Sequence, residues 1–146
     1  HEIIPNIRSK DILILATDIS MSMLKRARAA MYEEERVGDL PAAFLKKYFV
    51  QVGSERPRTY RVTDEVMANV RFAWLNLMDP WPMKGPFNVI FCRNVMIYFD
   101  RRTQQDLITR FWDLLEPGGY LFVGHSEGLS AIKHRFRYVQ PAIYKK

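Results

Sequence analysis

Polar side chains follow three apolar runs of the sequence that have the composition of buried strands. They belong to Asp18, Asn76, Arg93 and Asn94. In open α/β sheets, ligands bind in the crevice beyond the carboxyl ends of the strands, so polar groups at these ends indicate a binding site. The groups present can hydrogen-bond hydroxyls and amides, and the guanidinium can pair with a carboxylate. These residues are therefore the first candidates for chemistry.

Asp18 ends the apolar segment 11–18 and precedes a predicted helix. A carboxylate in this position can accept hydrogen bonds from both hydroxyls of a ribose, as the acid of dinucleotide-binding folds does. Alternatively, Asp18 can help to cap the helix that Ser20 begins. The residues alone leave these two roles equally open.

Asn76 and Leu77 follow the predicted strand 69–75. The Asn side chain or a backbone amide there can read the edge of an adenine, and Leu77 offers an apolar wall. An ordinary turn is the alternative, because Asn76 and the following Asp79 and Pro80 are good turn formers. On the residues alone, the turn is favoured.

The third group lies in residues 91–100, FCRNVMIYFD, after the predicted strand 86–92. Arg93 can pair with a carboxylate. Tyr98 comes four residues after Asn94, so a helical turn would place both on one face, whereas packing beneath the loop is the alternative for Tyr98. Cys92 is not expected to act as a nucleophile, because it lies in an apolar run with no histidine nearby.

Residues 124–128, GHSEG, match the Gly-x-Ser-x-Gly pattern of α/β-hydrolases. That fold needs an acid and then a histidine after the serine. After Ser126, the only acid is Glu127 and the only histidine is His134. An adjacent acid cannot orient a histidine that must also reach the serine, so the hydrolase interpretation fails. His125 and His134 lack a carboxylate or cysteine partner at metal-ligand spacing, and we predict no metal site.

Composition restricts the class of protein. The 146 residues are 48% hydrophobic, enough for one core, and the single cysteine suits a reducing cytosol. No apolar run approaches the roughly 18 residues of a membrane span. The formal charge is +6, but the basic residues are scattered, which favours a solvated surface or an acidic protein partner over a nucleic-acid channel.

Strands and helices alternate along most of the chain. The predicted strands are 11–18, 69–75, 86–92 and 120–124, and the predicted helices are 21–32 and 103–115. The first strand is continuously apolar, so we expect it to be buried on both faces. Two short strands surround Pro141, too close for a helical crossover and hence antiparallel. Residues 39–63 depart from the alternation: a short helix and a hairpin around 53–58 predict a small inserted β-subdomain.

The run FCRNVMIYFD closely resembles a signature of the CheR family, the S-adenosylmethionine-dependent methyltransferases that esterify glutamates on bacterial chemotaxis receptors. ATDI at 16–19, Asn-Leu at 76–77 and GHSE at 124–127 resemble further family segments. The resemblance implies an α/β fold, a Rossmann-like class I methyltransferase sheet with an inserted β-subdomain and an antiparallel C-terminal strand pair. It also implies chemosensory signal transduction in the cytoplasm, with S-adenosyl-L-methionine as cofactor and S-adenosyl-L-homocysteine as product.

The resemblance further implies roles for single residues. Asp18 would bind the ribose, and Asn76 with Leu77 the adenine. Backbone and side-chain groups of Cys92, Arg93 and Asn94 would hold the amino-acid end of the cofactor. The family's matching tyrosine lies near the transferred methyl group, which makes Tyr98, with Arg93, the catalytic pair. The GHSE run would support the floor of the site.

The implied partner is a methyl-accepting chemotaxis receptor, an acidic protein substrate, with neither nucleic acid nor membrane insertion expected. Class I methyltransferases carry a glycine-rich loop after their first strand, whereas the glycines here begin at Gly38. Residues 3–10 look like the end of the helix that leads into the second strand. We therefore expect a sheet truncated before its second strand, and the missing N-terminal portion of the same protein as a further partner.

Two functions stay open. The chain is part of a protein-glutamate O-methyltransferase, or it is a non-catalytic fragment or binding module that retains the fold and docks on a receptor or signalling partner. The missing glycine loop favours the second for this chain, which would then be inactive. The retained polar residues favour the enzyme for the intact parent protein. They are Asp18, Asn76, Arg93 and Tyr98.

Overall fold

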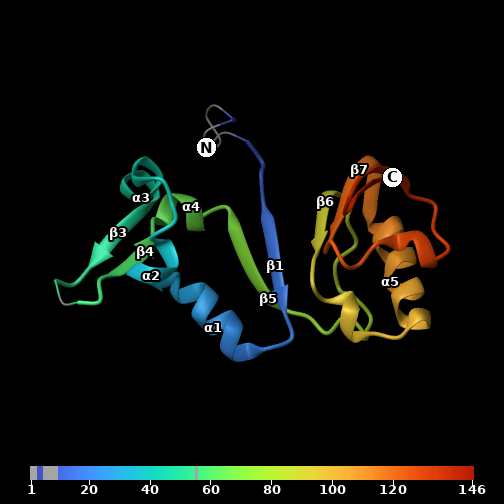
Figure 1. Cartoon of the computed structure of the whole chain (residues 1–146), viewed down its shortest axis with the longest axis horizontal. Helices are drawn as coiled ribbons and strands as arrows, with labels where there is room; N and C mark the ends of the chain where they lie inside the picture. The colour runs from blue at the N-terminus through green and yellow to red at the C-terminus, as the bar shows by residue number, and fades with distance from the viewer. Residues whose placement is uncertain (1–2, 5–9, 55) are drawn as a thin grey trace. The chain divides into compact units, whose positions relative to one another are not determined.

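The structure is a computed structural model that describes residues 3–4, 10–54 and 56–146. The expected helix end at 3–10 therefore lies largely outside the described residues. The chain divides into two compact units, His1–Asp79 and Pro80–Lys146, and each is described by itself. In the described part of the chain, the strands form three sheets of two, three and four strands (Figure 1). The architecture is mixed α/β, as the sequence predicts.

The first unit contains a parallel pair of strands, β1 (Ile14–Asp18) and β5 (Val70–Trp74). Helix α1 (Met21–Ala29) follows β1 and begins where the Ser20 side chain accepts a hydrogen bond from the Met23 N–H, as predicted. The helix ends earlier than predicted, at Ala30, which adopts a left-handed backbone with φ 53°. The reason is that the next residues leave the helix to pair as a strand.

The apolar side chains of β1 are largely exposed, so the expectation of burial on both faces is wrong for the described chain. Ile14 and Leu15 are 56% and 36% exposed. Among the described residues, β1 pairs along one edge only, with β5, and α1 packs against it. A parallel strand becomes buried when neighbours cover both its edges and both its faces. One strand and one helix are not enough.

The second sheet of this unit is antiparallel. β3 (Phe49–Val52) and β4 (Thr59–Val62) form the predicted hairpin, and β2 (Met31–Glu33) adds to the other edge of β4. The sequence did not predict β2. Helices α2 (Glu34–Val37) and α3 (Ala42–Tyr48) connect β2 to β3, and α4 (Asp64–Met67) follows β4. The assignment of residues 39–63 as an inserted subdomain stays a prediction.

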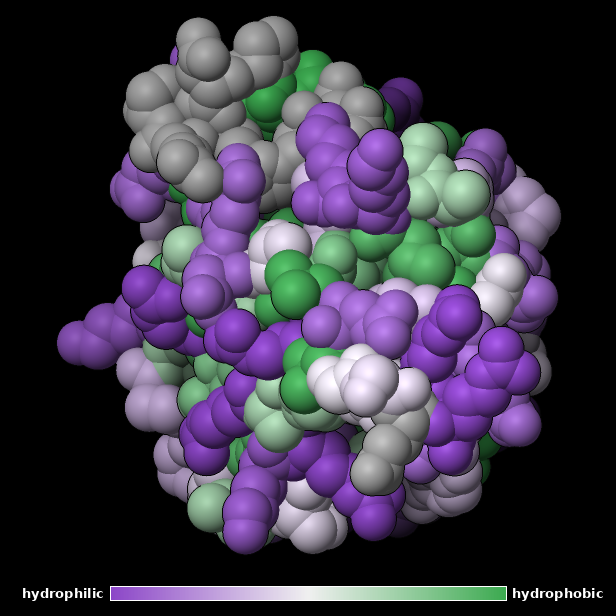
Figure 2. Space-filling model, turned by 90° about the vertical axis from the view of Figure 1, so that its left-hand side faces the viewer, coloured by the Kyte–Doolittle hydropathy of each residue, from purple (hydrophilic) through white to green (hydrophobic). Residues whose placement is uncertain are grey.

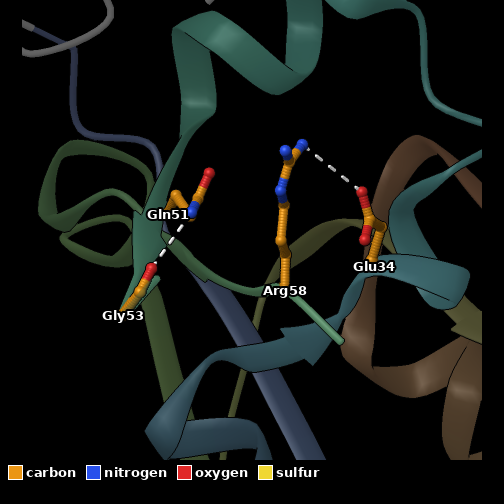
Figure 3. Close-up of polar contacts among 4 residues, drawn as sticks. All are labelled: Glu34, Gln51, Gly53 and Arg58. Carbon is orange, nitrogen blue, oxygen red and sulfur yellow. Dashed lines mark hydrogen bonds and ion pairs between the residues drawn. The ribbon is translucent and has the colours of Figure 1, made fainter. Parts of the chain in front are cut away.

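Polar contacts tie the strand ends beside the hairpin loop (Figure 3). The Gln51 side chain donates to the carbonyl of Gly53 at 3.0 Å. Just before β4, the guanidinium of Arg58 lies 3.7 Å from the carboxylate of Glu34. The backbone N–H of Glu34 donates to the Arg58 carbonyl at 2.8 Å. The start of α2 is thereby attached to the start of β4.

The second unit is built on β6 (Phe87–Cys92) and β7 (Leu115–Val123), which run parallel with Cys92 opposite Val123. β9 (Ile143–Lys145) pairs antiparallel with β7, and β8 (Arg137–Gln140) pairs antiparallel with β9. The predicted antiparallel pair at the C-terminus is therefore confirmed.

Helix α5 (Arg101–Leu114) connects β6 to β7. The Asp100 carboxylate begins the helix by accepting the Thr103 N–H at 2.8 Å. The buried face of the helix contains Leu107, Ile108 and Phe111, as the spacing of its apolar residues predicts. Among the described residues, no helix combines the length and apolarity needed to cross a bilayer.

Candidate functional site

The carboxyl ends of β1 and β5 lie side by side in the first unit. Asp18 stands opposite Trp74 in the parallel register, and the Leu75 N–H donates to the carbonyl of Asp18 at 3.1 Å. Asn76 and Leu77 continue directly from Leu75. The structure therefore gathers three of the predicted cofactor-binding residues, Asp18, Asn76 and Leu77, at one sheet edge.

The Asp18 carboxylate is exposed and combines the two roles that the sequence leaves open. Its Oδ1 accepts the N–H of Ser20, the residue that caps α1, at 2.7 Å. This bond corresponds to the capping role. None of the other described residues donates a hydrogen bond to Oδ2 of Asp18. One carboxylate oxygen thus orients the side chain, and the other is available to a ligand.

Asn76 forms the turn that the residues favour. Its side-chain oxygen accepts the Met78 N–H at 3.0 Å, and its carbonyl accepts the Asp79 N–H at 3.1 Å. This is the local side-chain-to-backbone bonding for which Asn is preferred in turns. Because the turn uses the amide oxygen, the NH₂ group is the part of the side chain left to donate to a ligand. Leu77, beside it, is half-buried.

The second unit has an edge of the same kind, where β6 and β7 end next to each other at Cys92 and Val123. Arg93 and Asn94 follow β6 and are exposed. The Arg93 guanidinium lies 3.4 Å from Nδ1 of His125, which belongs to the loop after β7. The two loops therefore meet at the carboxyl edge of the sheet.

Cys92 itself is buried at this edge. Burial raises the pKa of its thiol to about 12, and the negative charge of Glu127 acts in the same direction. A thiol with such a pKa is protonated at neutral pH and is a poor nucleophile. Cys92 can therefore contribute its backbone and its volume to a site, but not thiolate chemistry.

Glu127, from the loop after β7, organises both loops. Its side chain is only 6% exposed. Four backbone N–H groups donate to it: Oε1 accepts from Val95 and Ile97 at 2.8 and 3.2 Å, and Oε2 accepts from Asn94 and Gly124 at 2.7 and 2.6 Å. Burial alone would raise the pKa of this carboxyl, but the four donors outweigh it and hold the pKa below its ordinary value. Glu127 is thus a buried carboxylate ion.

Two expectations about Tyr98 are wrong. Asn94 has a left-handed backbone with φ 58°, and only Met96–Tyr98 form a short 3₁₀ helix, so Asn94 and Tyr98 do not share one helical turn. A left-handed residue interrupts the right-handed path that such sharing requires. Tyr98 is also 80% exposed, which contradicts packing beneath the loop. The phenol stands in solvent, in the loop that follows β6.

The role of Glu127 is the feature that sequence reasoning missed, beyond the general expectation that GHSE supports the site. A signal was present in the spacing, because an acid three residues after a glycine at the end of a buried strand can fold back onto the backbone. Here Gly124 must be a glycine: a Cβ atom would contact Oε2 of Glu127 and lie 2.7 Å from Oδ1 of Asn94.

The predicted residues thus fall into two groups. Asp18, Asn76 and Leu77 belong to the first unit, and Cys92, Arg93, Asn94 and Tyr98 to the second. Within the described ranges, no three His, Cys, Asp or Glu side chains converge as metal ligands. The chemistry of both groups is hydrogen bonding and charge pairing at the carboxyl ends of parallel strands, the usual ligand position of α/β sheets.

Comparison with known proteins identifies this arrangement. The family model of the CheR methyltransferase SAM-binding domain matches residues 1–144. The chain belongs to the CheR methyltransferase family. The resemblance noted in the sequence is therefore confirmed, and with it S-adenosylmethionine as the cofactor of this CheR domain.

Relatives of the CheR chain come from several bacteria. A probable chemotaxis protein methyltransferase of Rhizobium etli is 42% identical over 144 residues, which are 98% of this chain and 54% of the relative. The chemotaxis protein methyltransferase of Escherichia coli (strain K12) is 41% identical over 132 residues, 90% and 46% of the two chains. That of Borreliella burgdorferi is 42% identical over 136 residues, 92% and 47%. The chain spans about half the length of these curated relatives.

Proposed function

We propose that the protein carrying this CheR domain transfers the methyl group of S-adenosylmethionine to glutamate side chains of methyl-accepting chemotaxis receptors, forming methyl esters. The observation that carries the proposal is the match of residues 1–144 to the CheR SAM-binding domain. The relatives' names, chemotaxis protein methyltransferases, support the same activity. The buried free thiol Cys92 is consistent with a reducing compartment such as the cytoplasm.

The first group of residues is proposed to hold the nucleoside part of the cofactor. Asp18 accepts hydrogen bonds from the ribose hydroxyls, and Asn76 and Leu77 bind the adenine. Three features of the donor set fit this role: an exposed carboxylate with one oxygen unbonded by the described residues, an amide NH₂ beside it, and an apolar neighbour. Aspartate at the end of a strand has this function in other dinucleotide-binding sheets.

The second group is proposed to hold the amino-acid end of the cofactor and the substrate. Cys92, Arg93 and Asn94 supply backbone and side-chain groups at the end of β6, and Arg93 also pairs with a carboxylate. Arg93 and Tyr98 are the proposed catalytic residues. Their exposure is what a site for a protein side chain needs.

Little acid–base chemistry is required of these residues. A receptor glutamate, with a reference pKa of about 4.3, is already a carboxylate at neutral pH. The cofactor, when bound, supplies a methyl group already activated on a sulfonium. The protein's own residues therefore act by positioning the two reactants and by placing charge beside them.

We also propose that β1 and β6 each gain a further strand neighbour in the whole protein, as strands of a Rossmann-like methyltransferase fold. Exposed apolar side chains on both strands support this, Ile14 on β1 at 56% and Phe91 on β6 at 70%. Each strand has one paired edge among the described residues. An added strand would cover apolar surface that otherwise faces water and would pair edges that are otherwise open.

Residues 39–63 are proposed to dock on the receptor without binding the cofactor. β3 is an edge strand of its sheet in the described chain, and its Val50 and Val52 are 57% and 43% exposed. Figure 2 looks onto the side of the molecule that carries α3, β3 and β4, where hydrophobic areas lie between hydrophilic ones. An extended receptor segment could pair with such an edge. A structural flap over the sheet is the alternative.

The hairpin loop provides the test of docking. Replacement of residues 53–58 by a short Gly-Ser turn in the intact protein should weaken receptor association and leave cofactor affinity unchanged. Loss of cofactor binding in a folded variant would contradict the proposal. The Asp11→Ala variant, at an exposed position outside residues 39–63, is the control and should retain receptor association.

Methyl transfer itself is tested with the intact protein, a receptor cytoplasmic fragment and methyl-labelled S-adenosylmethionine. We expect label in the receptor that base treatment releases as methanol, the property of a glutamyl methyl ester. Binding of S-adenosylhomocysteine without label in the receptor would reject the transferase and favour the non-catalytic binding module. Tyr98→Phe should lower kcat and leave S-adenosylhomocysteine affinity near that of the wild type; equal losses would remove Tyr98 from the catalytic pair.

A further inference from the structure

The carboxylate of Glu127 makes its hydrogen bonds in an unusual place. Three of the four donors belong to the loop after β6. They are the N–H groups of Asn94, Val95 and Ile97, which lie 33, 32 and 30 positions before Glu127 in the sequence. The fourth belongs to Gly124 in Glu127's own loop. No side-chain cation of the described residues pairs with this buried charge. Hydrogen bonds from the backbone N–H groups of the two loops stabilise it instead.

The loop that receives these bonds is the one that carries the proposed catalytic residues. Arg93 immediately precedes the three held amides, and Tyr98 immediately follows them. The side chains of both are exposed, and Arg93 makes its contact, at 3.4 Å, with Nδ1 of His125, in the loop that also carries Glu127. The backbone between them is therefore the main source of their position, and this backbone is fixed by Glu127.

We propose that Glu127 is a positioning residue of the CheR site, whose carboxylate holds the loop between Arg93 and Tyr98 in the geometry that methyl transfer requires. This inference rests on the proposed function. It assigns to the GHSE motif a role beyond support of the site floor. Gly124 belongs to the same device, because a side chain there would occupy the space of the Glu127 and Asn94 oxygens.

The chemistry of the four bonds explains why the residue must be a carboxylate. All four partners are donors, and an ionised carboxylate offers only acceptors. A glutamine has one oxygen and one NH₂ group. Its NH₂ group would face two of the backbone N–H donors and leave them unpaired in the interior. An aspartate keeps the charge but is one methylene shorter and cannot reach both loops.

The first experiment measures the loop directly in the intact protein. Amide hydrogen exchange at Asn94, Val95, Ile97 and Gly124 should be slow in the wild type and faster by about 10-fold or more in Glu127→Gln, the loss expected for bonds to a charged group. Glu116→Gln is the matched control, since Glu116 accepts from Asn88 at 2.6 Å between the same two strands, near their other ends. Unchanged exchange in Glu127→Gln would overturn the proposal.

The second experiment measures the catalytic consequence. Misplacement of reacting groups by about 1 Å can cost on the order of 100-fold in rate, so kcat of Glu127→Gln should fall by about 10- to 100-fold, and that of Glu116→Gln should not. The double variant Arg93→Ala/Glu127→Gln should lower kcat by less than the product of the two single fold-changes, because Glu127→Gln alone already misplaces Arg93. A wild-type kcat in Glu127→Gln, or effects that multiply fully, would reject the positioning role.

The outcomes separate this inference from the proposed function. A wild-type protein that transfers no methyl group rejects the function, and the positioning role falls with it, whatever the exchange data show. An active wild type with an equally active Glu127→Gln rejects only the positioning role. If Glu127→Gln does not fold, Glu127→Asp takes its place in both assays, with a fall in kcat of about 10-fold expected and an unchanged kcat as the contrary result.

Discussion

The edge of the first unit and the edge of the second unit present polar residues in the same position relative to their strands, but they hold them differently. Asp18 and Asn76 are each oriented by a bond to a backbone N–H two positions away. Asn94 and Val95 are held by Glu127, which lies 33 and 32 positions further along the chain. One edge is organised locally and the other by a distant buried charge.

This difference has consequences for stability and for information. A bond between near neighbours forms with little loss of chain entropy, and its removal affects a small region. A buried carboxylate with four donors is costly to disturb, because each donor left unpaired in the interior loses its solvation. We therefore expect changes at the second edge to affect the fold of its unit, and changes at the first edge to affect mainly the ligand.

The largest expected effect is that of Gly124→Ala. The added Cβ would lie 2.7 Å from Oδ1 and 3.1 Å from the backbone nitrogen of Asn94. We expect a loss of about 2–4 kcal/mol in the free energy of unfolding of the second unit, measured by urea denaturation, from overpacking and from broken bonds to Glu127. Gly128→Ala is the control, because its Cβ would meet only the Tyr144 hydroxyl at 3.9 Å. Equal losses in both variants would show that the loop tolerates no side chain for another reason.

Acidification should lower the stability of the second unit by protonating Glu127. Because the pKa of folded Glu127 is lowered from its ordinary value of 4.5, its stabilising contribution is fully present above that value and is lost as the pH falls through the lowered pKa. Urea midpoints measured from neutral pH downward should therefore decline in this range, and less steeply in Glu127→Gln. An identical decline in the variant would assign the acid sensitivity to other groups, such as Asp100, whose pKa is lowered by the Thr103 N–H.

Asp18→Ala should act on the ligand at the first edge. Loss of a hydrogen bond to a charged group is expected to weaken binding of S-adenosylhomocysteine to the intact protein by about 1–3 kcal/mol, measured by calorimetry. Asp11→Ala, an exposed acid at the start of the same segment, should bind normally. Unchanged affinity in folded Asp18→Ala would leave Asp18 with its capping contact to Ser20 alone.

The smallest expected effect is that of Ser20→Ala, which removes the side-chain cap of α1. Loss of an N-cap costs about 1 kcal/mol of stability, and this should appear as a small shift in the thermal midpoint. Lys25→Ala, at an exposed position inside the helix, is the control and should be close to neutral because Ala favours helix. An unchanged midpoint in Ser20→Ala would mean that the Ser20 side chain does not stabilise the helix.

Much of the fold follows from local patterns in the sequence. Continuous apolar runs predicted β1, β5 and β6, and helical spacing of Leu107, Ile108 and Phe111 predicted the buried face of α5. The cap at Ser20 and the hairpin at 53–58 were predicted from residue types with known local preferences. Each of these features depends on neighbours within a few positions, so a short stretch of sequence contains the information.

Other features depend on residues far apart in the chain. Met31 and Tyr32 leave the predicted helix 21–32 and join β2, because β4, about thirty positions away, offers a strand to pair with. The exposure of β1 follows from having one strand neighbour among the described residues. The role of Glu127 appears only when the ends of β6 and β7 meet.

The sequence by itself therefore determined the family of this chain, its cofactor and the positions of its polar strand ends, because these are properties of short motifs. Only the tertiary structure decided which polar residue is buried and what it holds. Asp18 is an acid at the end of a strand and Glu127 is an acid shortly after one, yet Asp18 is exposed to solvent and Glu127 is buried and hydrogen-bonds the backbone of two loops. The physical reason is that burial and hydrogen bonding of a charge depend on donors that the fold brings from elsewhere.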